Sequence, residues 1–458
     1  GLREHLDYVE LRKFGLSFFF GEKDAAGDLA AADELGASDT FAVPTWQVDR
    51  GRLENTLVER ALAKGVTVHG GSRVTGLEMN GVKRLQVQGE AGERTLTSRW
   101  LIDATSRASL VKKHLKLQKD ADHDINASWF RVEGEVRVDD WSRNAAWQAR
   151  TGERARWFST NQLMGPGYWV WIIPLSSGAT SIGIVADPAY HPFKRIVSLE
   201  ASLAWLAEFE PRLYAALADH PTMDFGVLRH PSHDCRRVFD PSGWALTGES
   251  GMFLDPLYSP GTDFIAIANC FIGDLIARER SGSDITARTT AHEIMFRSLF
   301  QNTLSGYQGL YGGFGNVRFM AFKTTWDYCF YWGLFGLLYT QRAMTRPADD
   351  AELRNLLLQA VAMNRRMQRR FGKLAAAGTT EPAEGRFFDQ QSIPLMQRLN
   401  EDMLGNYDDA GLLDKVRSNI GTLERLSQAI VARLENTAAP VSDEERDLLG
   451  EFPALLRA

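Results

Sequence analysis

Hydrophobic residues recur every three or four positions along three long stretches of the chain. These stretches are residues 262–278, 351–373 and 412–435. This spacing places the apolar side chains on one face of a helix, where they can pack against a core. Because the pattern stays mostly helical from about residue 285 onward, we predict a helical C-terminal region over residues 285–458.

Apolar runs of strand length occupy much of the first half of the chain. Residues 168–175 and 179–186 are two such runs, separated by Ser176-Ser177-Gly178, and they predict a hairpin. Other predicted strands cover residues 84–88, 100–103 and 127–138. Strands in the first half and helices in the second predict a fold of the mixed α/β (α+β) class.

The overall composition is that of a large globular protein. With 458 residues, 44% of them hydrophobic, the chain can bury a substantial core. Its formal net charge of −6 argues against nucleic-acid binding, which needs a basic surface to neutralise phosphates. The cysteines are Cys235, Cys270 and Cys329, so neither a disulfide framework nor a metal site is indicated. We therefore expect a cytoplasmic protein.

The most distinctive segment runs from Gly243 to Gly261. It reads as the end of a strand, a turn with several glycines and the start of a helix. Gly248, Gly251 and Gly261 let another group approach the backbone closely. The free amides and partial positive charge of the helix start suit the anionic edge of a cofactor or a halide ion. An ordinary glycine turn before a packed helix explains these residues equally well.

Two motifs make this interpretation more specific. The tryptophan motif is Trp169-x-Trp171-x-Ile173-Pro174, and the turn motif is Phe253-x-x-Pro256-x-x-Ser259-x-Gly261. Both motifs, in this order, resemble those of the flavin-dependent halogenases, which belong to the same class as para-hydroxybenzoate hydroxylase. The resemblance covers residues 1 to about 345 and implies an FAD-dependent oxidoreductase.

The resemblance also implies a domain organisation. Residues 1–112 and 241–284 would form an FAD-binding Rossmann-like domain, interleaved with a substrate-side β-sheet domain over residues 113–240 and followed by the helical region 285–458. The Gly-x-Gly-x-x-Gly turn that holds the cofactor's pyrophosphate in this class is absent from the sequence. We therefore expect an N-terminally truncated chain that lacks the first βαβ unit and binds FAD weakly.

Several residues are candidates for contact with FAD through this resemblance. They are Arg50, Gly248, Glu249, Asp255, Pro256, Gly261 and Thr262. Arg50 opens a predicted helix that a strand at residues 66–68 would follow, and a solvent-exposed helix start is its alternative explanation. Glu249 replaces the Asp or Asn usual in the class, and Asp255 could instead cap the local turn. Thr105-Ser106 stands where the class normally has a glycine.

In the halogenases that the chain resembles, reduced flavin, oxygen and halide give hypohalous acid, which travels through a tunnel to a lysine beside the substrate. Lys13, followed by Phe14 and by Phe18-Phe19-Phe20, is the candidate lysine; a surface lysine at a strand start is the alternative. Trp169 and Trp171 would wall the tunnel, although sheet packing also explains them. Ser259 would belong to the catalytic turn. Pro260 has no N–H, which weakens the case for halide binding.

Two other segments carry candidate chemistry. Residues 319–339 are apolar nearly all round, but the uninterrupted run 328–339 is too short to span a bilayer. We predict a helix buried between lobes; an aromatic-lined substrate channel and a surface resting on a membrane are the alternatives. Basic residues follow at Arg365, Arg366, Arg369, Arg370 and Lys373. They could dock an acidic carrier protein or anionic lipid, or form a solvated helix face.

The sequence thus predicts an enzyme that uses FAD, reduced by a separate flavin reductase or by NAD(P)H, together with halide. Its expected substrate is a small electron-rich aromatic or conjugated compound, free or bound to an acyl carrier. A flavin monooxygenase or reductase that does not use halide is one alternative. An inactive scaffold that binds a partner through its helical C-terminal region is another. We expect a cytoplasmic location with peripheral membrane contact as a further option.

Overall fold

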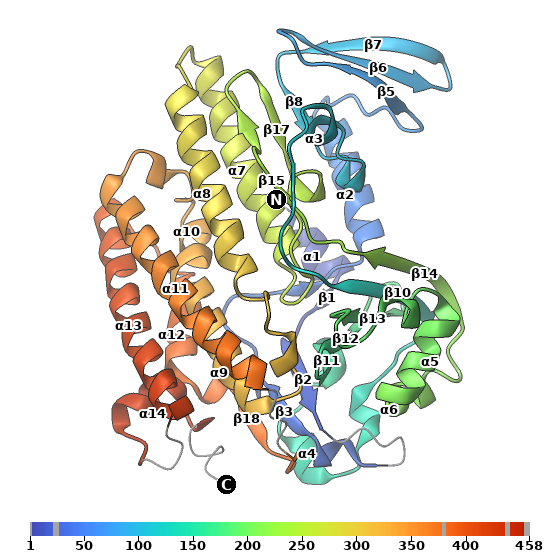
Figure 1. The fold of residues 1–458 in the computed structure, drawn as a ribbon, viewed down its shortest axis with the longest axis vertical. Coiled ribbons are helices and arrows are strands. Elements are labelled where there is room, and N and C mark those ends of the chain that lie inside the picture. Colours follow the sequence, from blue (N-terminus) through green and yellow to red (C-terminus); the bar gives the residue numbers. More distant parts are fainter. Residues whose placement is uncertain (1, 22–26, 378–381, 436–439, 453–458) are drawn as a thin grey trace.

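The computed structural model describes residues 2–21, 27–377, 382–435 and 440–452. Its largest sheet has eight strands in the order β14-β10-β13-β12-β11-β2-β3-β18 (Figure 1). The strands are β2 Leu16–Phe20, β3 Asp33–Gly36, β10 Asn126–Glu133, β11 Thr160–Gly165, β12 Tyr168–Pro174, β13 Ala179–Ala186, β14 Thr222–Arg229 and β18 Phe387–Asp389. The predicted hairpin is confirmed, because β12 pairs antiparallel with β13.

This sheet collects strands from three segments that lie far apart in the sequence. Strand β2, from the N-terminal segment, pairs in parallel with β11, and β18 pairs in parallel with β3. The region 285–458 is therefore not wholly helical. Its short strand adds to the sheet edge and buries Phe388 completely. The domain boundary at residue 112 stays a prediction, since strands from both sides of it share one sheet.

A second, three-stranded sheet has the order β16-β17-β8, with bounds Phe239–Asp240, Trp244–Leu246 and Leu101–Asp103. Strands β17 and β8 are parallel, so both end at the same edge, immediately before the glycine-containing turn. A third, antiparallel sheet stands apart at the upper right of Figure 1. Its strands are β5 Arg73–Glu78, β6 Lys83–Gly89 and β7 Gly92–Ser98.

Helix α2, Arg50–Ala63, begins where the sequence predicts, with the Asp49 side chain accepting a hydrogen bond from the Gly51 amide. The strand predicted at residues 66–68 is wrong, because this described segment pairs with no strand. A strand needs a neighbour for its backbone groups, and Val66 is instead 53% exposed. None of the residues of α2 is buried.

Five long helices pack side by side on the left of Figure 1: α7 Pro260–Arg280, α8 Thr286–Leu304, α9 Val317–Phe330, α11 Ala351–Ala377 and α13 Asp409–Glu435. Helices α7, α11 and α13 confirm the periodic stretches of the sequence. Among the described helices, α7 alone is long and apolar enough to cross a membrane, judged by length and composition. Its Phe271 and Leu275 are fully buried, while 39% of its apolar stretch is buried in all.

The apolar segment 319–339 forms a buried helix, as predicted. Helix α9 continues into a π-helical turn, Tyr331–Gly336, and then into α10, Leu337–Thr340. The loop predicted at residues 379–385 lies partly outside the described residues. The remaining elements are α1 Arg3–Val9, β1 Leu11–Arg12, β4 Trp46–Gln47, α3 Leu110–His114, β9 Gln118–Lys119, α4 Ala145–Ala149, α5 Leu199–Phe209, α6 Pro211–Ala216, β15 Asp234–Cys235, α12 Pro394–Asp402 and α14 Asp443–Leu449.

Candidate active site

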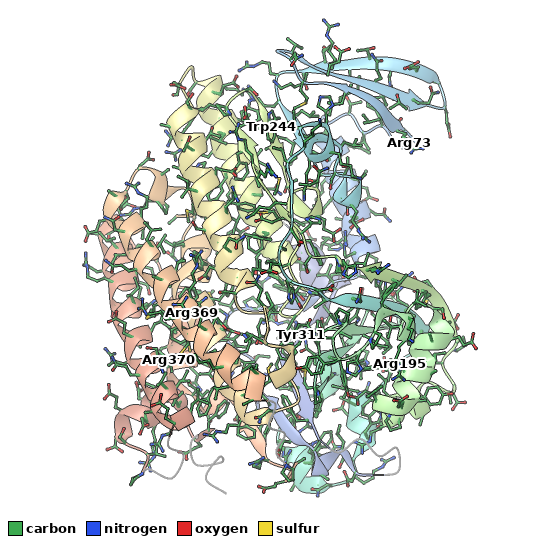
Figure 2. The ribbon with its side chains drawn as sticks, in the orientation of Figure 1. Arg73, Arg195, Trp244, Tyr311, Arg369 and Arg370 are labelled. Carbon is green, nitrogen blue, oxygen red and sulfur yellow. The ribbon has the colours of Figure 1, made fainter. Side chains whose placement is uncertain are left out.

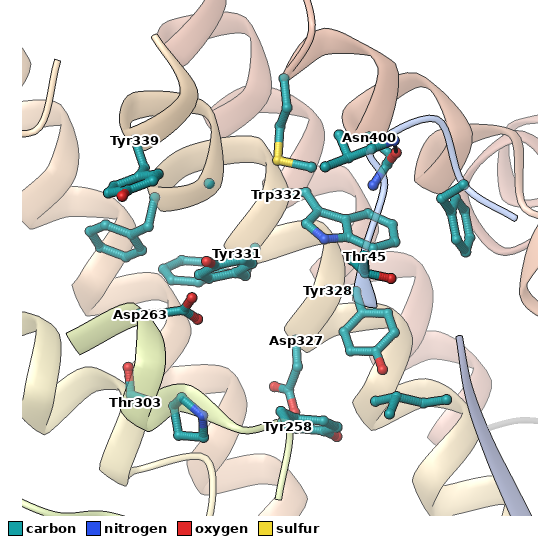
Figure 3. A pocket seen from close by; sticks show the side chains of 18 of the residues that line it. Thr45, Tyr258, Asp263, Thr303, Asp327, Tyr328, Tyr331, Trp332, Tyr339 and Asn400 are labelled. Carbon is teal, nitrogen blue, oxygen red and sulfur yellow. Dashed lines mark hydrogen bonds between the residues drawn. The ribbon is translucent and has the colours of Figure 1, made fainter. Parts of the chain in front are cut away.

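A cavity of about 440 Å³ lies between the N-terminal segment, the start of α7 and the segment from α9 to α10 (Figure 3). Many of its walls are aromatic: Phe14, Phe41, Tyr258, Phe264, Tyr307, Tyr328, Phe330, Tyr331, Trp332, Phe335 and Tyr339. This volume and lining suit a small apolar or aromatic ligand. The segment 328–339 therefore both packs between lobes and lines a pocket, which unites two of the alternatives that the sequence left open.

Lys13 lines this cavity together with Tyr258 and Pro260 from the turn motif. Its backbone is held by a hydrogen bond from the Lys13 amide to the Thr45 carbonyl, next to the short pairing of β1 with β4. Burial lowers the pKa of the Lys13 ammonium to about 8. Because no carboxylate pairs with it among the described residues, the neutral amine is accessible at moderately alkaline pH.

A second lysine, Lys323, lies beside the same cavity, and sequence reasoning did not assign it a role. Its Nζ atom lies 2.6 Å from the Asp327 carboxylate, and the Lys323 side chain is fully buried. Gln368 donates a further hydrogen bond to Asp327, at 2.7 Å. Asp327 and Gln368 both line the cavity, so this pair forms a polar end of an otherwise apolar pocket.

Asp263 places another carboxyl group at the cavity wall, from the first turn of α7. Figure 3 shows it beside Tyr331. Burial raises the pKa of Asp263 to about 6, and a hydrogen bond from Tyr331 acts in the opposite direction. The sequence gives no signal for this residue, because an acidic residue in a first helical turn is common.

The turn motif brings an unusual backbone to the cavity. Tyr258 and Ser259 both adopt positive φ angles, of 65° and 57°. Such conformations are costly for non-glycine residues and collect at functional sites. Pro260 is the first residue of α7 and has no N–H, so the open amides at this helix start belong to Gly261 and Thr262, which are exposed. A Cβ atom at Gly261 would meet nothing within 4 Å.

Asp255 is buried behind this turn. Its Oδ1 atom accepts a hydrogen bond from the Leu257 amide, and its Oδ2 atom accepts one from the Tyr311 hydroxyl at 2.6 Å. His123 Nε2 lies 2.8 Å from the same Oδ2 atom. The geometry favours the turn-holding interpretation of Asp255, and direct contact with a cofactor stays a prediction. Pro256 follows it in the same turn.

Tyr311 also connects the two sequence motifs. The Trp169 indole N–H donates to the Tyr311 hydroxyl at 3.1 Å, so the tryptophan motif is joined through Tyr311 to Asp255. Trp171 is partly buried and donates to Ser181 Oγ at 3.1 Å. Neither tryptophan lines the described cavity. Their packing is evident, while their role as a tunnel wall stays a prediction.

The remaining cofactor candidates lie near the ends of β8 and β17. Gly248 has a φ of 60°, and Ser106 adopts a φ of 50° where the class normally has a glycine. The Ser106 hydroxyl donates to the Glu249 carboxylate at 2.6 Å, which fastens the two turns together. Arg50 is exposed and pairs with Glu54 at 2.6 Å. No group of three or more potential metal ligands occurs among the described residues.

Comparisons with known proteins agree with this geometry. A family model described as an FAD binding domain matches residues 1–183. A flavin-dependent halogenase of Dictyostelium discoideum is 25% identical over 322 residues, which cover 64% of this chain and 52% of that protein. A 1H-pyrrole-2-carbonyl-peptidyl-carrier protein chlorinase of Pseudomonas fluorescens is 26% identical over 267 residues, 56% of each chain. The chain is thus similar in sequence to flavin-dependent halogenases and contains an FAD binding domain.

Solved structures show that this chain has the fold of known halogenases. Halogenase PltM in complex with phloroglucinol and FAD gives a TM-score of 0.64 at 14% identity, over 99% of this chain and 82% of that chain. The flavin-dependent brominase Bmp2 gives a TM-score of 0.53 at 17% identity, over 83% of this chain and 86% of that chain. The chain spans about half the length of the curated relatives it matches.

The start of α7 and the two turns beside it have the chemistry to hold the flavin end of FAD. The position of Gly261 is open to a close approach, and exposed amides of α7 stand beside it. Gly248 and Ser106 shape the two turns at the neighbouring sheet edge. Residues 1–458 contain no Gly-x-Gly-x-x-Gly motif for the pyrophosphate. The contacts that these residues offer are therefore to the flavin ring and not to the pyrophosphate.

Proposed function

We propose that the protein is an FAD-dependent halogenase that binds an electron-rich aromatic substrate in the cavity beside Lys13. The observation that carries the proposal is the shared cavity: Lys13 and the turn residues Tyr258 and Pro260 line the same space. The sequence similarity to flavin-dependent halogenases supports the same chemistry. PltM, whose structure contains phloroglucinol and FAD, supports a phenolic ring as the substrate class.

Lys13 and the aromatic side chains of the cavity would have different roles in the reaction. Bound FAD, reduced by a flavin reductase or by NAD(P)H, supplies the reaction with oxygen and halide that yields hypohalous acid. The Lys13 ammonium can donate a hydrogen bond to this acid and hold it in the cavity. The aromatic side chains exclude water and present a flat apolar surface to the substrate ring. Halogen delivery is thereby confined to one end of the pocket.

A flavin monooxygenase or reductase that uses no halide is a second candidate, and Pro260 favours it. Many halogenases would have an amide donor at this position, whereas Pro260 offers none at the start of α7. A halide would then have to bind through Gly261 and Thr262. The choice between the two candidates depends on whether halogen is incorporated.

We also propose that the substrate reaches the cavity attached to an acidic carrier protein. The relatives from Pseudomonas fluorescens and Pseudoalteromonas luteoviolacea are named for carrier-bound pyrroles. Helix α11 supports the same idea, because Asn364 and Gln368 line the cavity while basic side chains occupy its exposed face. These are Arg365, Arg366, Arg369, Arg370 and Lys373, and Figure 2 labels Arg369 and Arg370 on this helix.

The deciding experiment uses the protein encoded by the complete reading frame that contains residues 1–458. It is supplied with FAD, a flavin reductase, NADH, oxygen and either chloride or bromide, and it is offered phenols, pyrroles, indoles and carrier-bound acyl rings. We expect halogenated product by mass spectrometry. Oxygenated product without halogen, across the whole panel, would replace this proposal with the monooxygenase. Reversing Arg369 and Arg370 to Glu should weaken turnover of carrier-bound rings and leave free rings unaffected.

A further inference from the structure

Asp263 is the carboxyl group in the cavity that the proposed chemistry leaves without a role. It lines the cavity from the first turn of α7, and no basic side chain pairs with it among the described residues. Asp327, the other carboxylate of the cavity wall, is by contrast already engaged by Lys323 and Gln368. Asp263 therefore retains hydrogen-bonding capacity toward a ligand.

The surroundings of Asp263 are aromatic and hydroxylic. The Tyr331 side chain lies beside its carboxyl group and lowers its pKa, and Tyr307 and Tyr339 are close enough for its charge to affect their own pKa values. Lys13 and the paired Asp327 line the same cavity. A carboxylate accepts hydrogen bonds and donates none, so the ligand that it selects must carry a donor. A flat aromatic ring that carries a hydroxyl or N–H group supplies this donor and can also pack against the aromatic walls.

We propose that Asp263 is the substrate-recognition residue of the cavity, accepting a hydrogen bond from the ring hydroxyl or ring N–H of a phenol or azole. This proposal rests on the proposed function for the reaction but concerns binding of the substrate. The hydrogen bond fixes one edge of the ring at α7. It also raises the electron density of the ring, because a donor that shares its proton with a carboxylate gains anionic character. Rings without a donor bind without this contact.

The ionisation of Asp263 gives the interaction a characteristic pH dependence. Burial raises the pKa of this carboxyl to about 6, so that it is mostly ionised at pH 7.5 and mostly protonated at pH 5. Only the ionised form accepts from the ring at full strength. The Tyr331 hydrogen bond lowers this pKa, and a Tyr331→Phe substitution should therefore move the transition to higher pH.

The test measures binding by ligand-observed NMR in the complete protein, with resorcinol as the donor probe and 1,3-dimethoxybenzene as the matched ring without a donor. In Asp263→Asn, resorcinol should bind about tenfold more weakly at pH 7.5, because the acceptor loses the charge that strengthens the hydrogen bond. Dimethoxybenzene should change less than twofold. Asp219→Asn, at an exposed position that does not line the cavity, serves as the surface control.

Several outcomes would overturn the inference. Equal binding of resorcinol by Asp263→Asn and the unmutated protein would do so, as would equal weakening of both rings. If Asp263→Asn does not fold, the unmutated protein decides: resorcinol affinity must fall about tenfold between pH 7.5 and 5, and Tyr331→Phe must shift that fall upward. If resorcinol binding depends on Asp263 while no halide is ever incorporated, the proposed function fails and this inference stands.

Discussion

The two lysines beside the cavity differ in whether a carboxylate pairs with the ammonium group. Lys323 is completely enclosed, yet its charge is matched by Asp327 at 2.6 Å. Lys13 is only half-buried but has no carboxylate partner among the described residues, and burial lowers its pKa to about 8. Burial alone therefore does not make an amine reactive; an unmatched charge does, because desolvation then favours the neutral form. Lys13 is the residue suited to chemistry and Lys323 to structure.

Lys13→Met gives the largest expected effect. Methionine retains the aliphatic volume but has no amine, so halogenated product should fall by at least about 100-fold, while NADH-dependent oxygen consumption continues. Product is quantified by mass spectrometry and oxygen by electrode. Lys194→Met, at an exposed position, should retain full activity. A Lys13→Met enzyme that still halogenates would remove Lys13 from the mechanism.

Lys323→Met tests the other lysine. Removing one partner of a buried ion pair leaves Asp327 charged and unmatched, which should lower the free energy of unfolding by about 3–5 kcal/mol. Urea denaturation followed by circular dichroism measures this loss. Lys323→Met combined with Asp327→Leu should restore part of it, because no unpaired charge remains. A single variant as stable as the unmutated protein would contradict the assigned structural role.

Tyr311→Phe tests whether loss of a partner also destabilises the fold at other buried polar groups. The substitution removes the acceptor of the Trp169 N–H and a donor to Asp255. We expect a loss of roughly 2 kcal/mol of unfolding free energy, since buried groups are left unpaired. Trp169→Phe removes the same Trp169 hydrogen bond and also leaves a cavity, so its cost combines the two effects. If the unmutated protein, Tyr311→Phe and Trp169→Phe are equally stable in urea, the hydrogen bonds that connect the two motifs contribute nothing to the free energy of unfolding.

The smallest predicted effect is the pH dependence of stability due to Lys13. Its pKa is lower in the folded protein than in the unfolded chain, so the unfolded state binds more protons between about pH 8 and 10.5. Stability should therefore rise with pH across this window, by up to about 1.4 kcal/mol per pH unit, relative to Lys13→Met. Parallel urea titrations at pH 7.5 and 9.5 measure the difference. A constant difference would contradict the lowered pKa.

Local patterns in the sequence predicted much of the fold. The helical spacing over residues 262–278, 351–373 and 412–435 predicted α7, α11 and α13, because one buried stripe is enough to define a helix. The hairpin followed from its apolar runs and short turn. The strand at residues 66–68 was predicted wrongly, since apolar residues alone do not supply a pairing partner. Strand β18 was missed because three residues are too short to produce a recognisable pattern.

The candidate site was predictable only where motifs mark it. Lys13 lines the cavity together with Tyr258 and Pro260, which lie between the fixed positions of the turn motif. Asp263 and the Lys323–Asp327 pair carry no motif, and their importance depends on burial that only the fold reveals. The contact between Asp255 and His123 joins residues 132 positions apart, a separation beyond any local pattern.

The π-helical turn at Tyr331–Gly336 has a consequence for how substrate preference can change. This wider turn sets the orientation of Tyr331, Trp332 and Phe335, all of which line the cavity. Deleting one residue from it would convert the turn to regular α-helix and change which side chains of the turn face the cavity. A new set of side chains would then face the ligand without a single substitution. The pocket can thus be redesigned by changing length instead of residue identity.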